Sequence, residues 1–264
     1  MRPKPSLGQH FLKSQGVVDR IIALAAVGKN DHVLEIGPGT GALTRSLVRH
    51  AGRLVAVEKD DALARQLREE FGNTPSFGLV HGDILECPMD GLVTPGMKVV
   101  ANLSYNVATQ IILRLAPLSR LLACIVVMVQ KEVGSRICAK AGDSDYAALS
   151  VLLSSLFSCT PGFLVGPENF YPEPKVDSQV IKLVPREDPL PGADRGDYRT
   201  LVFTAFGQRR KMLRNSLLGL PGMTKNLLPE LARLSGANLD ARPQELAPEA
   251  FAKLFRAYRQ IIDA

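Results

Sequence analysis

Short apolar runs alternate with amphipathic segments over the first half of the chain. The apolar runs are rich in β-branched residues and have the length of buried strands: His32–Ile36, Arg53–Glu58, Phe77–His81, Lys98–Ala101 and Leu121–Val129. The other segments repeat their apolar positions at helical spacing: Gln15–Ala26, Ala42–His50, Asp61–Phe71, Val107–Ala116 and Lys131–Ala139. Strands that alternate with helices build βα units and a parallel sheet. The pattern therefore predicts an α/β fold with five parallel strands.

The pattern changes after a further helix, which we expect at Tyr146–Phe157. Two strand-like runs follow, Gly162–Gly166 and Val176–Val184, and the proline-rich segment Glu168–Pro174 connects them. Strands joined in this way form an antiparallel hairpin. We therefore expect a Rossmann-like sheet of seven strands, mostly parallel, with a final hairpin at its edge.

The segment Pro185–Gly196 has the composition of a linker, since it contains three prolines and two glycines. Only helical patterns follow it: Tyr198–Phe206, Gln208–Leu218, Lys225–Leu234 and Pro248–Tyr258. We therefore expect residues 1–185 to form the α/β domain and residues 186–264 to form a small all-α domain.

The net charge of +6 is concentrated at the two ends of the chain. Residues 1–29 hold five Lys/Arg and one Asp, and residues 185–264 hold thirteen Lys/Arg and nine Asp/Glu. A polyanion that both ends contact would explain this distribution. A solvated surface with an excess of lysine and arginine explains it equally well, so the charge alone leaves both interpretations open.

Several classes of protein do not fit the sequence. No apolar run reaches the ~20 residues of a membrane span, and the first twenty residues lack the apolar core of a secretory signal. The four cysteines form no C-x-x-C pair, and the four histidines form no H-E-x-x-H motif. We therefore expect a reducing, cytoplasmic setting, no membrane association and no metal site.

Candidate chemistry follows the strands, because ligands of open α/β sheets lie beyond the carboxyl ends of the strands. The first strand ends in the loop Gly37-Pro38-Gly39-Thr40-Gly41, whose glycines let a ligand approach the backbone. Glu58 ends the second strand, where it can accept hydrogen bonds from ribose hydroxyls, and Asp83 follows the third, where it can accept one from an adenine amino group. Nicotinamide dehydrogenases and methyltransferases share these binding features. The three loops therefore predict an adenosine-containing cofactor, either a nicotinamide dinucleotide or a methyl donor.

The fourth strand ends in Asn102-Leu103-Ser104-Tyr105, which separates the two alternatives. The N6 amino group of adenine is a poor nucleophile because its lone pair is delocalised into the ring. A side-chain amide oxygen and a backbone carbonyl can accept hydrogen bonds from this NH₂ group, and an aromatic ring can stack on the base. Asn102, the Leu103 carbonyl and Tyr105 supply these three elements. The motif therefore favours methyl transfer to an adenine, in which positioning and electrostatics do most of the catalysis.

At this point the sequence resembles the KsgA/RsmA-type rRNA adenine N6-dimethyltransferases, from Leu7 to about Tyr258. The motifs that carry the resemblance are Leu7-Gly8-Gln9-His10-Phe11-Leu12, Glu35-Ile36-Gly37-Pro38-Gly39-Thr40-Gly41, His81-Gly82-Asp83, Asn102-Leu103-Ser104-Tyr105, Val129-Gln130-Lys131-Glu132-Val133, Phe170-Tyr171-Pro172-Glu173-Pro174-Lys175-Val176-Asp177-Ser178 and Phe206-Gly207-Gln208-Arg209-Arg210-Lys211. The resemblance implies a class I methyltransferase sheet, S-adenosylmethionine as the cofactor, and a catalytic domain followed by a helical RNA-binding domain.

The resemblance also implies roles for the matched residues. The cofactor-binding set is Gln9, His10, Leu12, Gly37, Gly39, Glu58, Asp83 and Asn102. The N-terminal members would close over the methionine end, and Gly37 would lie under the carboxypropyl chain. The catalytic set is Asn102, Leu103, Tyr105 and Phe170, in which the two aromatic rings would sandwich the target base. The family usually has proline in place of Ser104, so we expect a modest loss of preorganisation there without loss of activity.

The family has two branches, and the motifs of this chain favour the branch that acts on small-subunit rRNA. The implied reaction is dimethylation of two adjacent adenosines near the 3′ end of 16S rRNA, within an immature 30S particle, by a monomeric enzyme. The implied RNA-binding residues are Arg209, Arg210, Lys211 and Arg214. We expect Arg210, Lys211 and Arg214 on one helical face, with Leu213, Leu217 and Leu220 turned inward; a merely solvated face would have the same pattern. An Erm-type enzyme for large-subunit rRNA and a non-catalytic ribosome-assembly factor remain alternatives.

Overall fold

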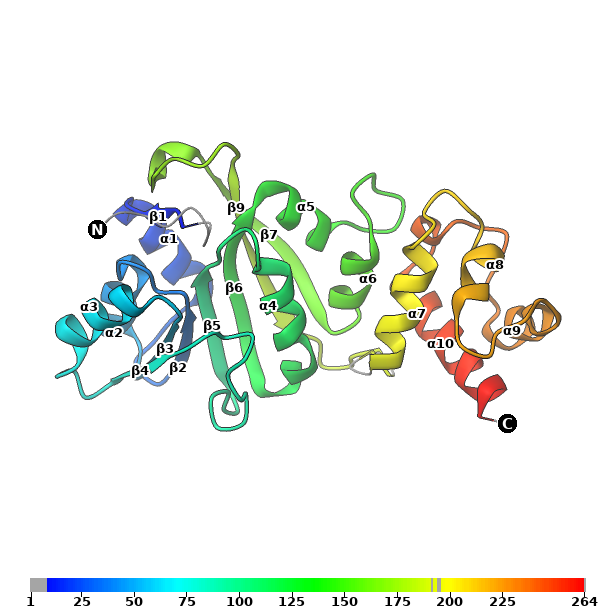
Figure 1. Cartoon of the computed structure of the whole chain (residues 1–264), viewed down its shortest axis with the longest axis horizontal. Helices are drawn as coiled ribbons and strands as arrows, with labels where there is room; N and C mark the ends of the chain where they lie inside the picture. Colours follow the sequence, from blue (N-terminus) through cyan, green and yellow to red (C-terminus); the bar gives the residue numbers. More distant parts are fainter. Residues whose placement is uncertain (1–8, 191, 194–195, 264) are drawn as a thin grey trace. The chain divides into compact units, whose positions relative to one another are not determined.

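The structure of the protein is a computed structural model that describes residues 9–190, 192–193 and 196–263 (Figure 1). The chain folds into two compact units. The α/β unit contains the chain up to Gly134 together with Cys159–Pro185, and the helical unit contains Ser135–Ser158 together with the chain from Arg186 onward. The division thus includes a boundary after residue 185, and it also groups residues 135–158 with the C-terminal helices.

A seven-stranded sheet in the order β4-β3-β2-β5-β6-β9-β7 forms the centre of the α/β fold. Its strands are β2 (His32–Ile36), β3 (Arg53–Glu58), β4 (Phe77–His81), β5 (Met97–Asn102), β6 (Leu122–Gln130), β7 (Phe157–Val165) and β9 (Ser178–Pro185). Strands β2 to β6 pair in parallel, and β9 pairs with β6 antiparallel. The prediction of seven strands, of which five are parallel, is confirmed.

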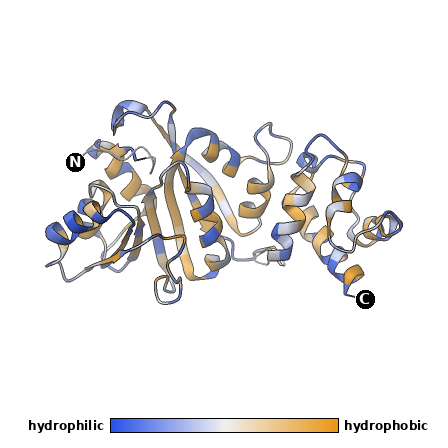
Figure 2. Cartoon of the chain, in the orientation of Figure 1, coloured by the Kyte–Doolittle hydropathy of each residue, from blue (hydrophilic) through white to orange (hydrophobic). Residues whose placement is uncertain are grey.

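Helices cover the sheet, which explains why the central strands are apolar without alternation. The helices of this part of the chain are α1 (Gln15–Ala25), α2 (Ala42–His50), α3 (Asp61–Phe71), α4 (Ala108–Leu115) and α5 (Lys131–Cys138). Helices α1 and α2 pack on one face, where Ile21 and Leu47 meet Val100 and Val126. Figure 1 shows α4 in front of the central strands, and Figure 2 shows the apolar residues concentrated on those strands. Local chemistry sets the helix bounds as well, since the Asp60 side chain caps α3 by accepting hydrogen bonds from two backbone amides.

A second, two-stranded sheet was not predicted. Strand β1 (Phe11–Leu12) pairs antiparallel with β8 (Phe170–Tyr171), and the register places Phe11 opposite Tyr171 and Leu12 opposite Phe170. This pairing joins the N-terminal motif to the proline-rich connection between β7 and β9. Leu7 and Gly8, which begin that motif, lie outside the described residues.

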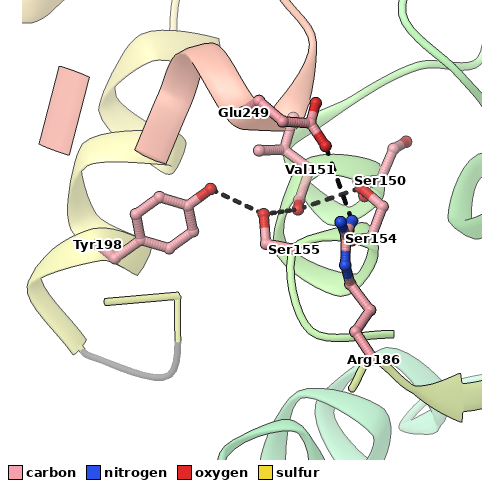
Figure 3. Close-up of polar contacts among 7 residues, drawn as sticks. All are labelled: Ser150, Val151, Ser154, Ser155, Arg186, Tyr198 and Glu249. Atoms are coloured by element: carbon pink, nitrogen blue, oxygen red, sulfur yellow. Dashed lines mark hydrogen bonds and ion pairs between the residues drawn. The ribbon is translucent and has the colours of Figure 1, made fainter. Parts of the chain in front are cut away.

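The helical unit has its own core. Its helices are α6 (Ala148–Ser154), α7 (Gly196–Phe206), α8 (Leu213–Ser216), α9 (Leu228–Ser235) and α10 (Pro248–Ile262). Its short 3₁₀ helices are η4 (Leu217–Gly219), η5 (Lys225–Leu227) and η6 (Pro243–Glu245), whereas η2 (Ala116–Leu121) and η3 (Pro167–Asn169) belong to the α/β unit. The buried Tyr198 hydroxyl of α7 lies 2.8 Å from Ser155 Oγ, and Arg186 donates to the Ser154 carbonyl and faces Glu249 of α10 (Figure 3). These contacts explain why residues 135–158 group with the C-terminal helices.

The predicted helix Gln208–Leu218 is wrong in its first half. Residues 207–211 form a turn, and α8 begins only at Leu213. The backbone amides of Leu213 and Arg214 donate to the carbonyls of Ala241 and Leu239 instead of to a preceding helical turn. Tertiary hydrogen bonds thus replace the helical ones. The inward-facing apolar positions are nevertheless confirmed, because Leu213, Leu217 and Leu220 are buried.

No helix of the described chain is both long and apolar enough to span a membrane. None of the four cysteines, all of which lie in the described part of the chain, takes part in a disulfide bond.

Candidate functional site

A cavity of about 310 Å³ lies at the carboxyl ends of the parallel strands, entirely within the α/β unit. Its walls come from the N-terminal segment, the glycine loop after β2, and the loops after β3, β4 and β5. The sequence-predicted residues that line it are Gln9, His10, Leu12, Gly37, Gly39, Glu58, Asp83, Asn102, Leu103 and Tyr105. The fold thus brings together, in one cavity, every predicted cofactor-binding residue and three of the four predicted catalytic residues.

The glycine loop adopts a backbone conformation that favours glycine. Gly37 and Gly39 have φ values of +65° and +60°, in the left-handed region where a Cβ atom is strained. A Cβ atom on Gly37 would meet no atom within 4 Å, whereas one on Gly39 would lie 3.2 Å from the ring of Phe11. The backbone at Gly37 therefore faces open space, as a cradle for an extended ligand chain requires.

Glu58 ties the end of β3 to the glycine loop. Its Oε2 accepts a hydrogen bond from the Gly39 amide at 3.0 Å, and its Oε1 accepts one from the Asp60 amide at 2.8 Å. Burial raises the pKa of this carboxyl, and the backbone hydrogen bonds counteract the rise. Each oxygen keeps a second lone pair for a ligand hydroxyl.

Asp83 is an anionic acceptor in the loop after β4, where it lines the cavity. Lys59 Nζ lies 2.6 Å from its Oδ2, and the Leu85 amide donates to its Oδ1 at 2.9 Å. The hydrogen bond from Lys59 is the main cause that holds the pKa of Asp83 below its usual value. The carboxylate is thus ionised at neutral pH and fixed in orientation.

Glu35, which the sequence analysis did not single out, is the least expected member of the cavity wall. It is 1% exposed, and neither carboxylate oxygen has a hydrogen bond of ordinary geometry. Burial raises its pKa to about 8, and the nearby Thr44 offsets only part of this effect. The signal in the sequence was an acidic residue inside an otherwise buried apolar strand. An unpartnered carboxyl that lines a cavity can pair with a cationic group of a ligand.

Hydrogen bonds fix the loop after β5, which contains three of the predicted catalytic residues. Asn102 Nδ2 donates to the His10 carbonyl at 3.3 Å, which leaves its Oδ1 available as an acceptor. The Leu103 amide donates to the Met128 carbonyl, and the Tyr105 hydroxyl lies 2.7 Å from Ser178 Oγ. The Ser104 carbonyl accepts hydrogen bonds from the amides of residues 107 and 108 at the start of α4. Backbone hydrogen bonds therefore hold this loop although serine replaces the proline that the family usually has.

His10 connects the N-terminal segment to two other parts of the site, the loop after β5 and the proline-rich segment after β8. Its ring stacks on Tyr105, with centroids 5.4 Å apart and planes inclined by 29°, and its Nδ1 donates to the Pro172 carbonyl at 2.8 Å. The neighbouring Phe170, by contrast, does not line the cavity. It is 1% exposed and belongs to the same core cluster as Leu12, its partner in the β1–β8 register.

The predicted RNA-binding residues do not share a helical face. Arg209, Arg210 and Lys211 are exposed in the turn before α8, and Arg209 donates to the Ser144 carbonyl. Arg214 lies on α8, 2.7 Å from Asp240. The expectation of one basic helical face is wrong because the helix on which it depended does not form.

Among the described residues, no group of three His, Cys, Asp or Glu side chains is placed so that it could hold a metal ion.

Comparisons with known proteins agree with this geometry. The family model "Ribosomal RNA adenine dimethylase" matches residues 1–258. A protein of Geobacter sulfurreducens called ribosomal RNA small subunit methyltransferase A is 42% identical over 263 residues, which cover 96% of this chain and 94% of its own length. The protein of the same name from Gloeobacter violaceus is 44% identical and covers 94% of this chain and 90% of its own length.

Two solved structures are similar over nearly the whole chain. A dimethyladenosine transferase from Plasmodium falciparum is 26% identical, with a TM-score of 0.81, and covers 95% of this chain and 98% of its own. The 23S rRNA methyltransferase ErmE is also 26% identical, with a TM-score of 0.68, and covers 94% of this chain and 98% of its own. The first of these resembles the present fold more closely.

Proposed function

Since the chain belongs to the ribosomal RNA adenine dimethylase family, we propose that it transfers methyl groups from S-adenosylmethionine to the N6 amino groups of adenosines in small-subunit rRNA. The protein is an rRNA adenine dimethyltransferase, and this membership removes the dehydrogenase alternative. The observation that carries the assignment is a single cavity that contains both the adenosine-binding acids and the Asn102–Tyr105 loop.

The residues of the cavity fit S-adenosylmethionine. The open backbone at Gly37 would lie along its carboxypropyl chain, Glu58 would accept from its ribose hydroxyls, and Asp83 would accept from its adenine amino group. Glu35 would face its ammonium group, which would supply the charge partner that both carboxylate oxygens lack. When bound, the cofactor supplies an activated methyl group on a sulfonium, so the protein has to position the acceptor rather than activate the donor.

The chain's own residues would prepare the acceptor nitrogen. Asn102 Oδ1 and the Leu103 carbonyl would each accept a hydrogen bond from the adenine NH₂ group, which would favour a pyramidal nitrogen whose lone pair is localised and points at the methyl group. The Tyr105 ring would stack on the base, and the His10 ring and the hydrogen bond to Ser178 hold it in place. The reaction then depends mainly on the orientation of the acceptor and on electrostatics. The alkylated nitrogen loses its extra proton to water.

Phe170 would complete the pocket only after a rearrangement. As the second wall of the base pocket it has to leave the core contact with Leu12 and turn toward Tyr105. The segment that holds it also contacts His10 through the Pro172 carbonyl. We propose that binding of the target adenosine turns the Phe170 side chain toward Tyr105 while the β1–β8 pairing is kept.

We assign the substrate to two adjacent adenosines near the 3′ end of 16S rRNA, in an immature 30S particle and in the cytoplasm, with the protein acting as a monomer. The similar proteins named small subunit methyltransferase A support this choice over an Erm-type target. Residues 1–185 would carry the chemistry, and the exposed Arg209, Arg210 and Lys211, with Arg214, would contact RNA phosphates from the helical domain.

The test is methyl transfer to isolated ribosomal particles. The protein is incubated with methyl-labelled S-adenosylmethionine and either immature small subunits or large subunits, and the labelled nucleotides are mapped. We expect N6-dimethyladenosine at two adjacent positions of the small-subunit rRNA. Label in large subunits alone would support an Erm-type enzyme, and an Asn102→Ala variant that supports ribosome assembly fully would favour a non-catalytic role.

A further inference from the structure

Tyr171 is an exposed aromatic residue beside the cavity, and neither the fold nor the proposed reaction uses it. It is 62% exposed, the largest value among the exposed large apolar and aromatic side chains of the described chain. Its neighbour Phe170, by contrast, is almost completely buried. Since successive residues of a strand point to opposite sides, β8 turns one ring into the core and presents the other to solvent.

The β1–β8 register places Tyr171 next to the cavity. Tyr171 is the antiparallel partner of Phe11, and directly opposite residues of a strand pair have their side chains on the same face, about 5 Å apart at Cβ. Phe11 lines the cavity and lies against the glycine loop at Gly39. The Tyr171 ring is therefore one cross-strand step from the cavity wall.

A cation accompanies this ring. The Lys13 amide donates to the Asn169 carbonyl at 2.9 Å, which continues the β1–β8 ladder by one residue. Lys13 follows Phe11 by two positions, so it has its side chain on the same face. Its Nζ is 4.0 Å from Glu173 and about half exposed, a weak surface pair that a phosphate could replace.

We propose that Tyr171 stacks on the base next to the target adenosine in single-stranded RNA, with Lys13 beside the connecting phosphate. This inference rests on the proposed function. An exposed ring with a neighbouring lysine is the usual means by which proteins bind unpaired nucleotides. A base moved out of its helix for methylation leaves its neighbour partly unstacked, and the Tyr171 ring replaces the lost stacking partner.

Steady-state methylation of immature small subunits tests the proposal in four proteins: wild type, Tyr171→Ala, Tyr171→Phe and Leu164→Ala. Leu164 is the matched control, since it is 52% exposed on β7 and does not line the cavity. We expect kcat/KM for RNA to fall about five- to 150-fold in Tyr171→Ala, the range of one base stack, and to stay within about twofold in the other two variants. Melting temperature and cofactor affinity should equal those of the wild type in all four.

The chain contains no tryptophan, so Tyr171→Trp introduces a single fluorescent reporter. Single-stranded oligoadenylate should quench the tryptophan fluorescence of Tyr171→Trp and should leave that of Leu164→Trp unchanged. The proposal is overturned if Tyr171→Ala has the kcat/KM of the wild type for RNA, or if its affinity for the cofactor falls as much as its kcat/KM for RNA. It is also overturned if oligoadenylate quenches the tryptophans of Tyr171→Trp and Leu164→Trp equally. If the wild type itself transfers no methyl group to RNA, the proposed function fails instead.

Discussion

Replacement of Glu35 by glutamine should change how the stability of the protein depends on pH. Glu35 is completely buried, neither oxygen has a hydrogen bond of ordinary geometry, and its pKa lies at about 8 in the folded protein against 4.5 ordinarily. Desolvation is the largest cause, and the nearby charge of Glu58 adds to it. The other ionisable residues that line the cavity are His10, Lys59, Asp83 and Tyr105.

The direction of the effect follows from proton counting. The unfolded chain loses the Glu35 proton near pH 4.5, whereas the folded protein keeps it up to about pH 8. Between these values the folded state holds more protons, so a rise in pH lowers the free energy of unfolding. The difference in pKa corresponds to at most about 5 kcal/mol. Glutamine is nearly isosteric and does not ionise, so Glu35→Gln should lack this loss of stability.

Urea unfolding of the wild type and of Glu35→Gln at several values between pH 5 and pH 8.5 measures the effect. The two free energies of unfolding should be similar at the acid end, and the variant should become the more stable protein by several kcal/mol at the alkaline end. Glu69→Gln, an exposed change of the same charge on α3, is the control. Addition of S-adenosylhomocysteine, which retains the ammonium group, should flatten the wild-type curve. Parallel pH curves for the wild type and Glu35→Gln would refute the reasoning.

Three further predictions concern the cavity and the basic turn. Asn102→Ala should lower turnover by about 100-fold through misorientation of the acceptor, with a smaller loss of cofactor affinity in equilibrium binding; unchanged turnover would remove Asn102 from the mechanism. Gly39→Ala should destabilise the protein by about 1–2 kcal/mol in urea unfolding, because its φ of +60° strains a Cβ atom that also meets Phe11; an unchanged midpoint would contradict this. The double variant Arg210→Ala and Lys211→Ala should weaken RNA binding and reduce the slope of log K against log salt by about two, whereas an identical slope would exclude phosphate contacts at these residues.

Local sequence was sufficient for most elements of the α/β fold. Strands β2, β3 and β4 and helices α2 and α3 have the predicted bounds, because the apolar periodicity that specifies each of them is a property of residues close in the chain. The acids and glycines at the strand ends line one cavity. Parallel strands that end at one edge of a sheet bring Gly37, Glu58, Asp83 and Asn102 together whatever the details of packing.

Contacts between distant segments decided the rest. The β1–β8 pair joins residues about 160 positions apart, and its register alone determines that Phe170 is buried and Tyr171 is exposed. The amides of Leu213 and Arg214 donate to the carbonyls of Ala241 and Leu239, and the predicted helix therefore begins only at Leu213. Residues 135–158 group with the C-terminal helices through contacts such as Ser155 with Tyr198. Periodicity records which side of an element is apolar, but not which distant segment will cover it. The sequence by itself therefore determined the sheet and the chemistry at its edge, and only the tertiary structure decided which side chains enter the cavity and which are exposed beside it.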